Sequence, residues 1–223
     1  MENSRINAVI TGDIVASSSL ATGDQHTRLL SILESSFRAI GEILPGGIRA
    51  PFEMYRGDSF QGVLWKPKDA LRAVITVRAC LRSGGERALG LHALDARIAV
   101  GIGLIESFPD GRVSGATGEA FSRSGRALDS MKKGQRRILI RTTSPEVDAE
   151  LDTECALLDA LICKWSPRQA KAILTQIRGL TQKQAASEMG ISQPAVRQRL
   201  SGAASWAVAQ LNVRYEQLVS ALG

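Results

Sequence analysis

Two aspartates, Asp13 and Asp58, stand where carboxylates could share a metal ion. Asp13 closes a short apolar run over residues 7–14, and Asp58 follows Gly57 at the turn between two short strands. In a split βαβ sheet the first strand is central and this hairpin lies beside it, so the carboxylates come from adjacent strands. Mg²⁺ prefers hard oxygen ligands and usually takes one or two carboxylates with substrate phosphates. The pair therefore predicts a metal and phosphate site, with turn-forming or capping carboxylates as the alternative.

The second group of candidate residues lies in segment 179–203, GLTQKQAASEMGISQPAVRQRLSGA. Its spacing is typical of a helix-turn-helix. Ala186 is small where two helices would nearly touch, Gly190 supplies the positive φ of a tight turn, and Val196 packs back onto the first helix. Thr181 and Ser192 are suited to cap the two helices.

The second of these helices would present polar side chains outward. With Ser192 at its start, these are Gln193, Arg197, Gln198 and Arg199. Side chains of this kind hydrogen-bond base edges and phosphates in a major groove, so we expect duplex DNA as a partner. The alternative is an ordinary helical hairpin whose Gln/Arg face is solvated.

The elements that must position the aspartates alternate between strands and helices. Apolar periodicity and Gly/Pro boundaries predict the order β-α-β-β-α-β-α-β, which is the split βαβ, ferredoxin-like arrangement with further elements appended. Helices are expected over residues 25–44, 69–82 and 119–131, and strands over 7–14, within 52–65, and over 96–105 and 137–142. Gly101 and Gly103 in the fourth strand allow a close backbone approach.

From residue 154 onward the pattern is wholly helical, with helices expected over 154–164, 167–178 and 205–222 besides the two described above. Residues 143–153 are polar and acidic, which favours a linker. We therefore predict an α+β fold, with a ferredoxin-like α/β domain over residues 1–145 and an all-α helix-turn-helix domain over residues 146–223.

Four segments of the N-terminal domain, taken in order, resemble a known family. TGDIVASS, YRGDSFQG, ARIAVGIG and GEAFSRSGRAL are similar to the class III nucleotide cyclase fold. With the helix-turn-helix that follows, the chain resembles the SatD family more closely, and this resemblance covers essentially its whole length. The first segment and YRGDSFQ are its specific parts. The resemblance implies a nucleotide-cyclase-like N-terminal domain.

The resemblance also implies roles for particular residues. Cyclases bind two metals through an Asp at the end of the first strand and an Asp in the hairpin, which match Asp13 and Asp58, and the carbonyl of Ile14 would join them. The implied cofactor is Mg²⁺ or Mn²⁺. On the helix at 118–128, Arg126 matches a transition-state Arg, and Ser122 stands where the family has Asn; both are candidates for binding a ligand's phosphate.

Other positions depart from the cyclase pattern. Met54 replaces a base-reading Lys, and the base-reading Asp before Gly118 is missing. Metal and phosphate features are thus kept while base-reading and turnover features are changed, which favours a binding or sensing domain over an active cyclase. An enzyme that produces a nucleotide signal, with the helical domain for targeting, is one alternative, and a bare dimerisation scaffold is another.

Composition excludes several other classes of protein. The chain has 28 Lys and Arg against 22 Asp and Glu, a net charge of +6, which agrees with a nucleic-acid partner without proving one. Its three cysteines have no CxxC spacing and its two histidines lie far apart, so neither a zinc site nor a His-based triad is indicated. No signal peptide or long apolar run is visible, which predicts a cytoplasmic protein that does not enter a membrane.

Together these features predict a cytoplasmic bacterial DNA-binding regulator whose N-terminal domain senses a nucleotide or other anionic ligand with a divalent metal. We expect a homodimer, because two half-sites give the contacts that one helix-turn-helix lacks. The last helix carries an apolar stripe that could form part of the dimer interface: Trp206, Val208, Leu211, Tyr215 and Leu218.

Overall fold

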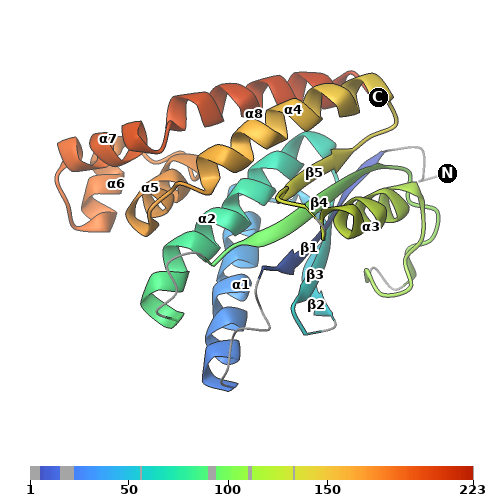
Figure 1. Ribbon diagram of the computed structural model, residues 1–223, viewed down its shortest axis with the longest axis horizontal. Coiled ribbons are helices and arrows are strands. Elements are labelled where there is room, and N and C mark those ends of the chain that lie inside the picture. The colour runs from blue at the N-terminus through green and yellow to red at the C-terminus, as the bar shows by residue number, and fades with distance from the viewer. Residues whose placement is uncertain are drawn as a thin grey trace.

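A five-stranded sheet forms the centre of the N-terminal half (Figure 1). The computed structural model describes residues 6–15, 23–55, 57–89, 94–109, 112–132 and 134–222, with the backbone alone for 85–89. The strands are β1 (Asn7–Ile14), β2 (Ile48–Tyr55), β3 (Ser59–Leu64), β4 (Ala96–Gly103) and β5 (Ile138–Arg141), in the order β2-β3-β1-β4-β5. Strand β1 is antiparallel to β3 and β4, and β4 is parallel to β5. The ferredoxin-like prediction is therefore confirmed, with β5 added at one edge.

Helices cover both faces of this sheet. Helices α1 (Gly23–Ile43) and α2 (Ala70–Leu89) lie on one face, and α3 (Glu119–Met131) lies on the other (Figure 1). Strand β1 alternates accordingly: Ala8 and Ile10 belong to the main core, whereas Val9 belongs to a smaller cluster with Ala120 of α3. Because both faces are covered, every residue of β1 is buried.

The second helix is longer than the sequence indicated. It follows a short 3₁₀ turn (η2, Pro67–Asp69) and continues to Leu89, although residues 83–85 were expected to end it. Each internal glycine costs a helix about 1 kcal/mol relative to alanine. The extensive packing of α2 against α1 and α5 outweighs that cost.

The C-terminal half consists of α4 (Pro145–Ile162), α5 (Pro167–Ile177), α6 (Gln182–Met189), α7 (Gln193–Gly202) and α8 (Ser205–Ser220). The predicted linker at 143–153 is wrong, because α4 begins inside it. Ser144 accepts a hydrogen bond from the backbone N–H of Val147, Pro145 occupies the first turn, and Glu146 and Asp148 are acidic near the helix N-terminus. These helix-start signals outweigh the polar composition that favoured a loop.

The two halves share one hydrophobic core. Leu158, Ile173 and Tyr215 of the helical half belong to the same cluster as the sheet residues that face α1 and α2. The Tyr215 hydroxyl donates a hydrogen bond of 2.7 Å to the carbonyl of Pro67. The C-terminal helices therefore lie directly on α2 and β5, with α4 and α8 side by side along the top of Figure 1.

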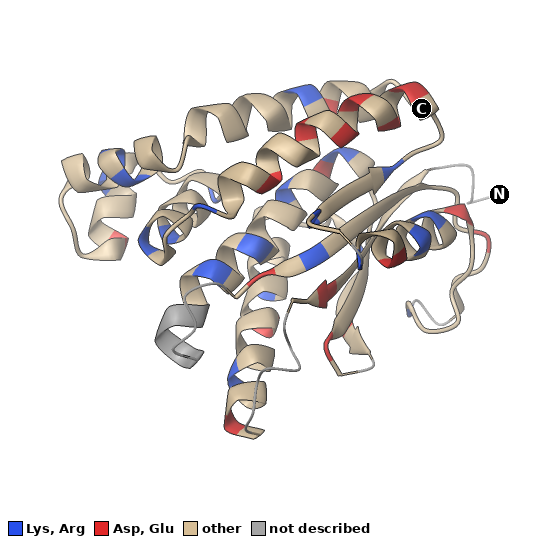
Figure 2. Ribbon diagram, in the orientation of Figure 1, with Lys and Arg blue, Asp and Glu red and all other residues tan. Residues whose placement is uncertain are grey.

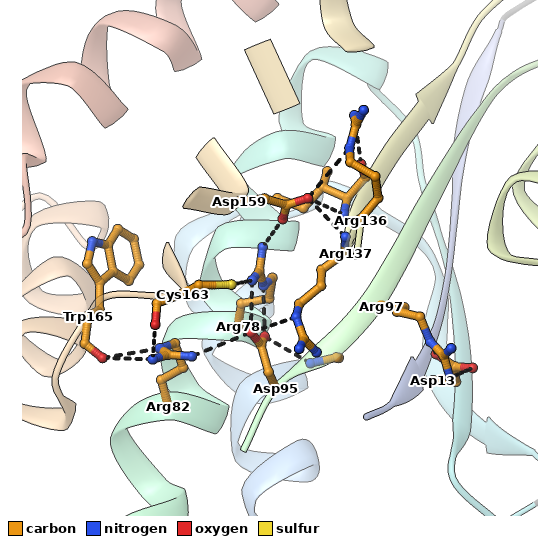
Figure 3. A network of polar contacts seen from close by, with 12 residues as sticks. Asp13, Arg78, Arg82, Asp95, Arg97, Arg136, Arg137, Asp159, Cys163 and Trp165 are labelled. Carbon is orange, nitrogen blue, oxygen red and sulfur yellow. Dashed lines mark hydrogen bonds and ion pairs between the residues drawn. The ribbon is translucent and has the colours of Figure 1, made fainter. Parts of the chain in front are cut away.

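A buried ion cluster fastens α4 to the sheet (Figure 3). Arg78 of α2 is fully buried and donates two hydrogen bonds of 2.8 Å to Asp95, just before β4. Its third bond, of 2.5 Å, goes to Asp159 of α4. Asp159 also accepts from the backbone N–H groups of Arg137 and Ile138 at the start of β5. One guanidinium thus joins three elements that are distant in the sequence.

Most of the apolar stripe expected on the last helix packs against the chain's own core. Val208 and Tyr215 are buried, and Leu211 and Leu218 pack partly buried against the chain's own core. Of the five stripe residues, Trp206 is the one that is largely exposed, at 71%. The interface prediction is therefore wrong for Val208 and Tyr215, which are buried in the chain's own core, and stays a prediction for Leu211, Leu218 and Trp206. Among the described helices, none has the length and apolar character to cross a membrane.

Candidate nucleic-acid interface and carboxylate pair

Helices α6 and α7 form the predicted helix-turn-helix. Thr181 caps α6 in a capping box with Gln184, and Gly190 ends this helix in the left-handed region, at φ 64° and ψ 39°. Ser192 then caps α7 by accepting from the backbone N–H of Ala195. The sequence placed all of these turn and cap residues correctly.

A small apolar cluster fixes the angle between the two helices. Ala185 and Ala186 of α6 and Val196 of α7 are buried, and partly buried Met189 and Leu200 pack around them. Ala186 and Val196 thus hold the positions predicted for them. The packing leaves the opposite side of α7 free to enter a groove.

The polar side of α7 faces solvent. Gln193, Arg197 and Gln198 are exposed, Arg199 is half-buried, and the exposed Ser192 uses its hydroxyl for the cap. In the described part of the chain, none of the three exposed side chains makes an ion pair or a side-chain hydrogen bond. Figure 2 shows basic positions on α5 and α7 at this end of the molecule. The face is therefore free to donate to base edges or phosphates.

The two predicted metal residues lie at neighbouring ends of β1 and β3. Asp13 is opposite Ser59 in the antiparallel pair, and the Ile14 N–H donates a 3.2 Å hydrogen bond to the carbonyl of Asp58. Asp13 is buried and Asp58 is half-buried. Gly12 permits this pairing, since a Cβ there would come within 2.3 Å of the Phe60 ring. The prediction that Asp13 and Asp58 lie at the ends of adjacent strands is therefore confirmed.

Asp13 is paired with Arg97, a residue that the sequence did not single out. Arg97 at the start of β4 donates from Nε and Nη2 to the two carboxylate oxygens, at 2.8 and 2.9 Å (Figure 3). This fork engages both carboxylate oxygens of Asp13, so a cation there would compete with the Arg97 guanidinium. Among the described residues no group of three or more His, Cys, Asp or Glu side chains could hold a metal ion. Asp13 and Asp58 thus offer a divalent cation two carboxylates, one of which is already paired with Arg97.

The candidate phosphate ligands lie on the other side of α3. The buried side of this helix contacts the sheet, where the Thr11 hydroxyl donates to Ser124 at 3.0 Å. Ser122 and Arg126 are exposed one turn apart on the opposite side. The structure shows no contact that joins Ser122 or Arg126 to Asp13 or Asp58 within the residues it describes.

The register of the sheet could have revealed Arg97. Strands 7–14 and 96–105 were both predicted, and pairing Gly12 with Ile98 places Asp13 opposite Arg97. The buried cluster left a weaker signal. Arg78 is a charged residue inside the apolar run of α2, which called for a buried partner that the sequence alone did not identify.

Fold and site together define a two-part protein: a ferredoxin-like α/β domain joined to a helix-turn-helix DNA-binding domain. Residues 155–204 match the family model described as sigma-70, region 4. The match begins within α4 and ends just after α7, so it contains the whole helix-turn-helix. It covers under a quarter of the 223 residues and leaves the SatD resemblance a prediction.

Solved structures similar to this chain include three cyclases. A bacterial light-regulated adenylyl cyclase is 16% identical over 63% of this chain and 44% of its own, with a TM-score of 0.47. An adenylate/guanylate cyclase/hydrolase from Silicibacter pomeroyi is 20% identical over 58% and 71%, with a TM-score of 0.45. The GGEEF domain of a Vibrio cholerae diguanylate cyclase is 15% identical over 63% and 84%, with a TM-score of 0.42. The chain thus spans less than half of the light-regulated cyclase, and no curated protein matches it.

Proposed function

We propose that this protein is a cytoplasmic transcription regulator that reads duplex DNA with α7. The observation that carries the proposal is the exposed face of Gln193, Arg197 and Gln198 on a capped, correctly packed helix-turn-helix. The match of residues 155–204 to sigma-70 region 4 supports it. A helix presented in this way enters the major groove with its N-terminal residues against the bases.

The test begins with selection of a preferred duplex from a random pool by the full chain. If Arg197 contacts a guanine, Arg197→Ala should weaken binding to that duplex by about 1–3 kcal/mol. If Arg197 contacts a phosphate, the substitution should reduce the slope of log K against log salt concentration by about one unit. Arg214→Ala is a matched control, because Arg214 is an exposed arginine of α8 paired with Glu150. Unchanged affinity in the alanine variants of Gln193, Arg197 and Arg199 would refute the proposal.

We further propose that the N-terminal domain senses a phosphorylated ligand together with Mg²⁺ or Mn²⁺ at Asp13 and Asp58, joined by the Ile14 carbonyl. The closeness of the two strand ends supports this, and the Arg97 fork opposes it. A cation must therefore compete with an internal guanidinium. Opening this ion pair would link ligand binding to a change at β4.

Titration calorimetry with Mg²⁺ or Mn²⁺ and a panel of nucleotides tests the sensor. Asp13→Asn and Asp58→Asn should abolish metal-dependent binding, whereas Arg97→Gln should strengthen binding of the metal alone because its competitor is removed. Arg126→Ala should weaken the nucleotide but spare the metal. If no nucleotide binds, or the Asp variants bind as well as the parent, the aspartates are turn residues.

We also propose a homodimer that places two copies of α7 on half-sites about one DNA turn apart. The buried Val208 and Tyr215 cannot contribute to the interface, and Trp206 is the stripe residue most open to a partner. Light scattering at micromolar concentration, with and without the selected duplex, measures the mass. A monomer under both conditions would rule the dimer out.

A further inference from the structure

A cavity of about 370 Å³ lies between the two halves of the chain, where α1 and α2 meet α5 and α6. Its walls include Ala39 and Ile43 of α1, Cys80 of α2, and Leu174 and Ile177 of α5. We call it the junction cavity. Pockets for small molecules commonly have this size and occur where domains meet. Neither the DNA-binding face nor the carboxylate pair lines it.

The polar groups inside the junction cavity are already satisfied. The hydroxyls of Thr76, Thr175 and Ser83 donate to backbone carbonyls of their own helices, at 2.8, 2.7 and 3.1 Å. Burial raises the pKa of the Cys80 thiol to about 12, so this group is neutral. The inner wall therefore offers a ligand mainly apolar contact, without competing donors or acceptors.

Four charged side chains stand at the opening of the junction cavity: Glu42, Lys171, Arg178 and Glu188. Arg178 and Glu188 neutralise each other through a 2.7 Å ion pair between α5 and α6. Glu42 and Lys171 are exposed, and neither forms an ion pair or a side-chain hydrogen bond with another residue of the described ranges. Besides the hydrogen bond to Glu188, the charge of Glu42 also acts on Arg178 and helps to raise its pKa, so two carboxylates share one guanidinium and leave one negative charge in excess. The opening thus presents this excess negative charge and the separate ammonium group of Lys171.

We propose that the junction cavity binds a small apolar molecule bearing both a carboxylate and an ammonium group, the chemistry of an apolar amino acid. The apolar body fills the space lined by Ile43, Leu174 and Ile177. The ligand carboxylate pairs with Lys171 and its ammonium group with Glu42. Because the walls come from both halves, the bound molecule bridges α1 and α2 to the helices that carry α7. This site is independent of the proposed metal site and of DNA contact.

Calorimetry on the full chain tests the proposal with four probes: L-leucine, L-phenylalanine, 4-methylpentanoate and 3-methylbutylamine. The amino acids should bind one per chain and about 5-fold more tightly than the acid or the amine alone, because each of these probes lacks one pairing of about 1 kcal/mol. Equal binding of all four probes would overturn the ligand chemistry. Absence of any binding at millimolar concentration would overturn the site.

Variants locate the binding within the cavity. Ala39→Phe fills the space and should abolish binding, and Lys171→Gln and Glu42→Gln should each weaken it about 5-fold. Lys164→Gln is the matched control, since Lys164 is an exposed lysine that does not line the cavity. Lys171 and Glu42 are exposed, so their variants remain informative if Ala39→Phe does not fold. Parent-like affinity in both of these variants would contradict the proposal.

Discussion

At the scale of single residues, the fully buried Arg78 holds Asp95 and Asp159 together. Burial alone would lower its pKa, but the hydrogen bonds and charge of Asp95 outweigh burial and raise it further. Burial likewise would raise the pKa of Asp95, yet the Arg78 guanidinium holds it below its ordinary value. A buried charge is tolerable only when it is paired and hydrogen-bonded in this way. Each member of the cluster therefore depends on the others.

Replacing Arg78 should be severely destabilising. Arg78→Met keeps much of the side-chain volume but leaves Asp95 and Asp159 without their main partner, and breaking a buried pair costs about 3–5 kcal/mol. Urea unfolding of the parent and the variant measures the change in free energy. Arg214→Ala, which breaks an exposed pair with Glu150, should cost less than about 1 kcal/mol. A loss of similar size in both variants would contradict this account of the cluster.

The same cluster should make stability sensitive to acid. Because the pKa of Asp95 is lower in the folded chain than in the unfolded chain, its contribution is complete above the ordinary value of about 3.9. That contribution is lost as the pH falls below 4 through the folded-state pKa. The free energy of unfolding, measured by urea between pH 3 and 6, should therefore drop more steeply in the parent than in Asp95→Asn. Parallel curves would show that Asp95 contributes nothing to the pH dependence.

At the scale of elements, α3 lies unusually close to β4 because of Gly101. A Cβ at this position would come within 2.0 Å of the Ala120 carbonyl and 2.5 Å of the Ser124 amide nitrogen. Both obstacles are backbone, so a side chain could not be accommodated by a change of rotamer. The close approach seats Ser124 against Thr11 on β1. The position of α3 on the sheet thus depends on the absence of a side chain at Gly101.

Gly101→Ala should therefore displace α3 and destabilise the chain by about 1–3 kcal/mol, the usual cost of overpacking. Gly125→Ala provides the control on the same helix, because nothing lies within 4 Å of a Cβ added there. That substitution should be neutral or stabilising by up to about 1 kcal/mol, since alanine favours helix. Thermal unfolding of the two variants compares them directly. A well-tolerated Gly101→Ala would mean that α3 can shift without loss.

Local signals made some elements predictable from the sequence and others not. Thr181, Gly190 and Ser192 act on their own neighbours in the chain, so the helix-turn-helix could be located to the residue. The fork between Arg97 and Asp13, which are 84 residues apart, depends instead on the register between β1 and β4. Ser144 and Pro145 carry a start signal for α4, although the acidic composition of the segment favours a loop. Long-range pairing and the packing of the two halves require the folded chain.

At the scale of the whole molecule, the two halves are built as one body. The core is continuous from the sheet through α2 to α4, α5 and α8. Arg82 strengthens this junction by donating to the backbone carbonyls of Cys163 and Trp165, where α4 passes into α5. Packed side chains and hydrogen bonds thus connect the sheet to the helices that carry the helix-turn-helix. Through this connection the proposed ligand binding in the N-terminal domain would alter DNA binding.

Such a body should unfold in a single transition. A variant with Trp65→Phe and Trp206→Phe retains Trp165, which is 3% exposed and donates from Nε1 to the Ala203 carbonyl at 3.0 Å. Its fluorescence in urea reports the helical half, whereas far-UV circular dichroism reports both halves. Because the core and the Arg78 cluster span the junction, the two midpoints should coincide.

Adding Asp159→Ala, which removes one side of the cluster, should lower both midpoints together. If fluorescence changes before or after the dichroism, the helical half folds independently and the shared core does not couple the two halves.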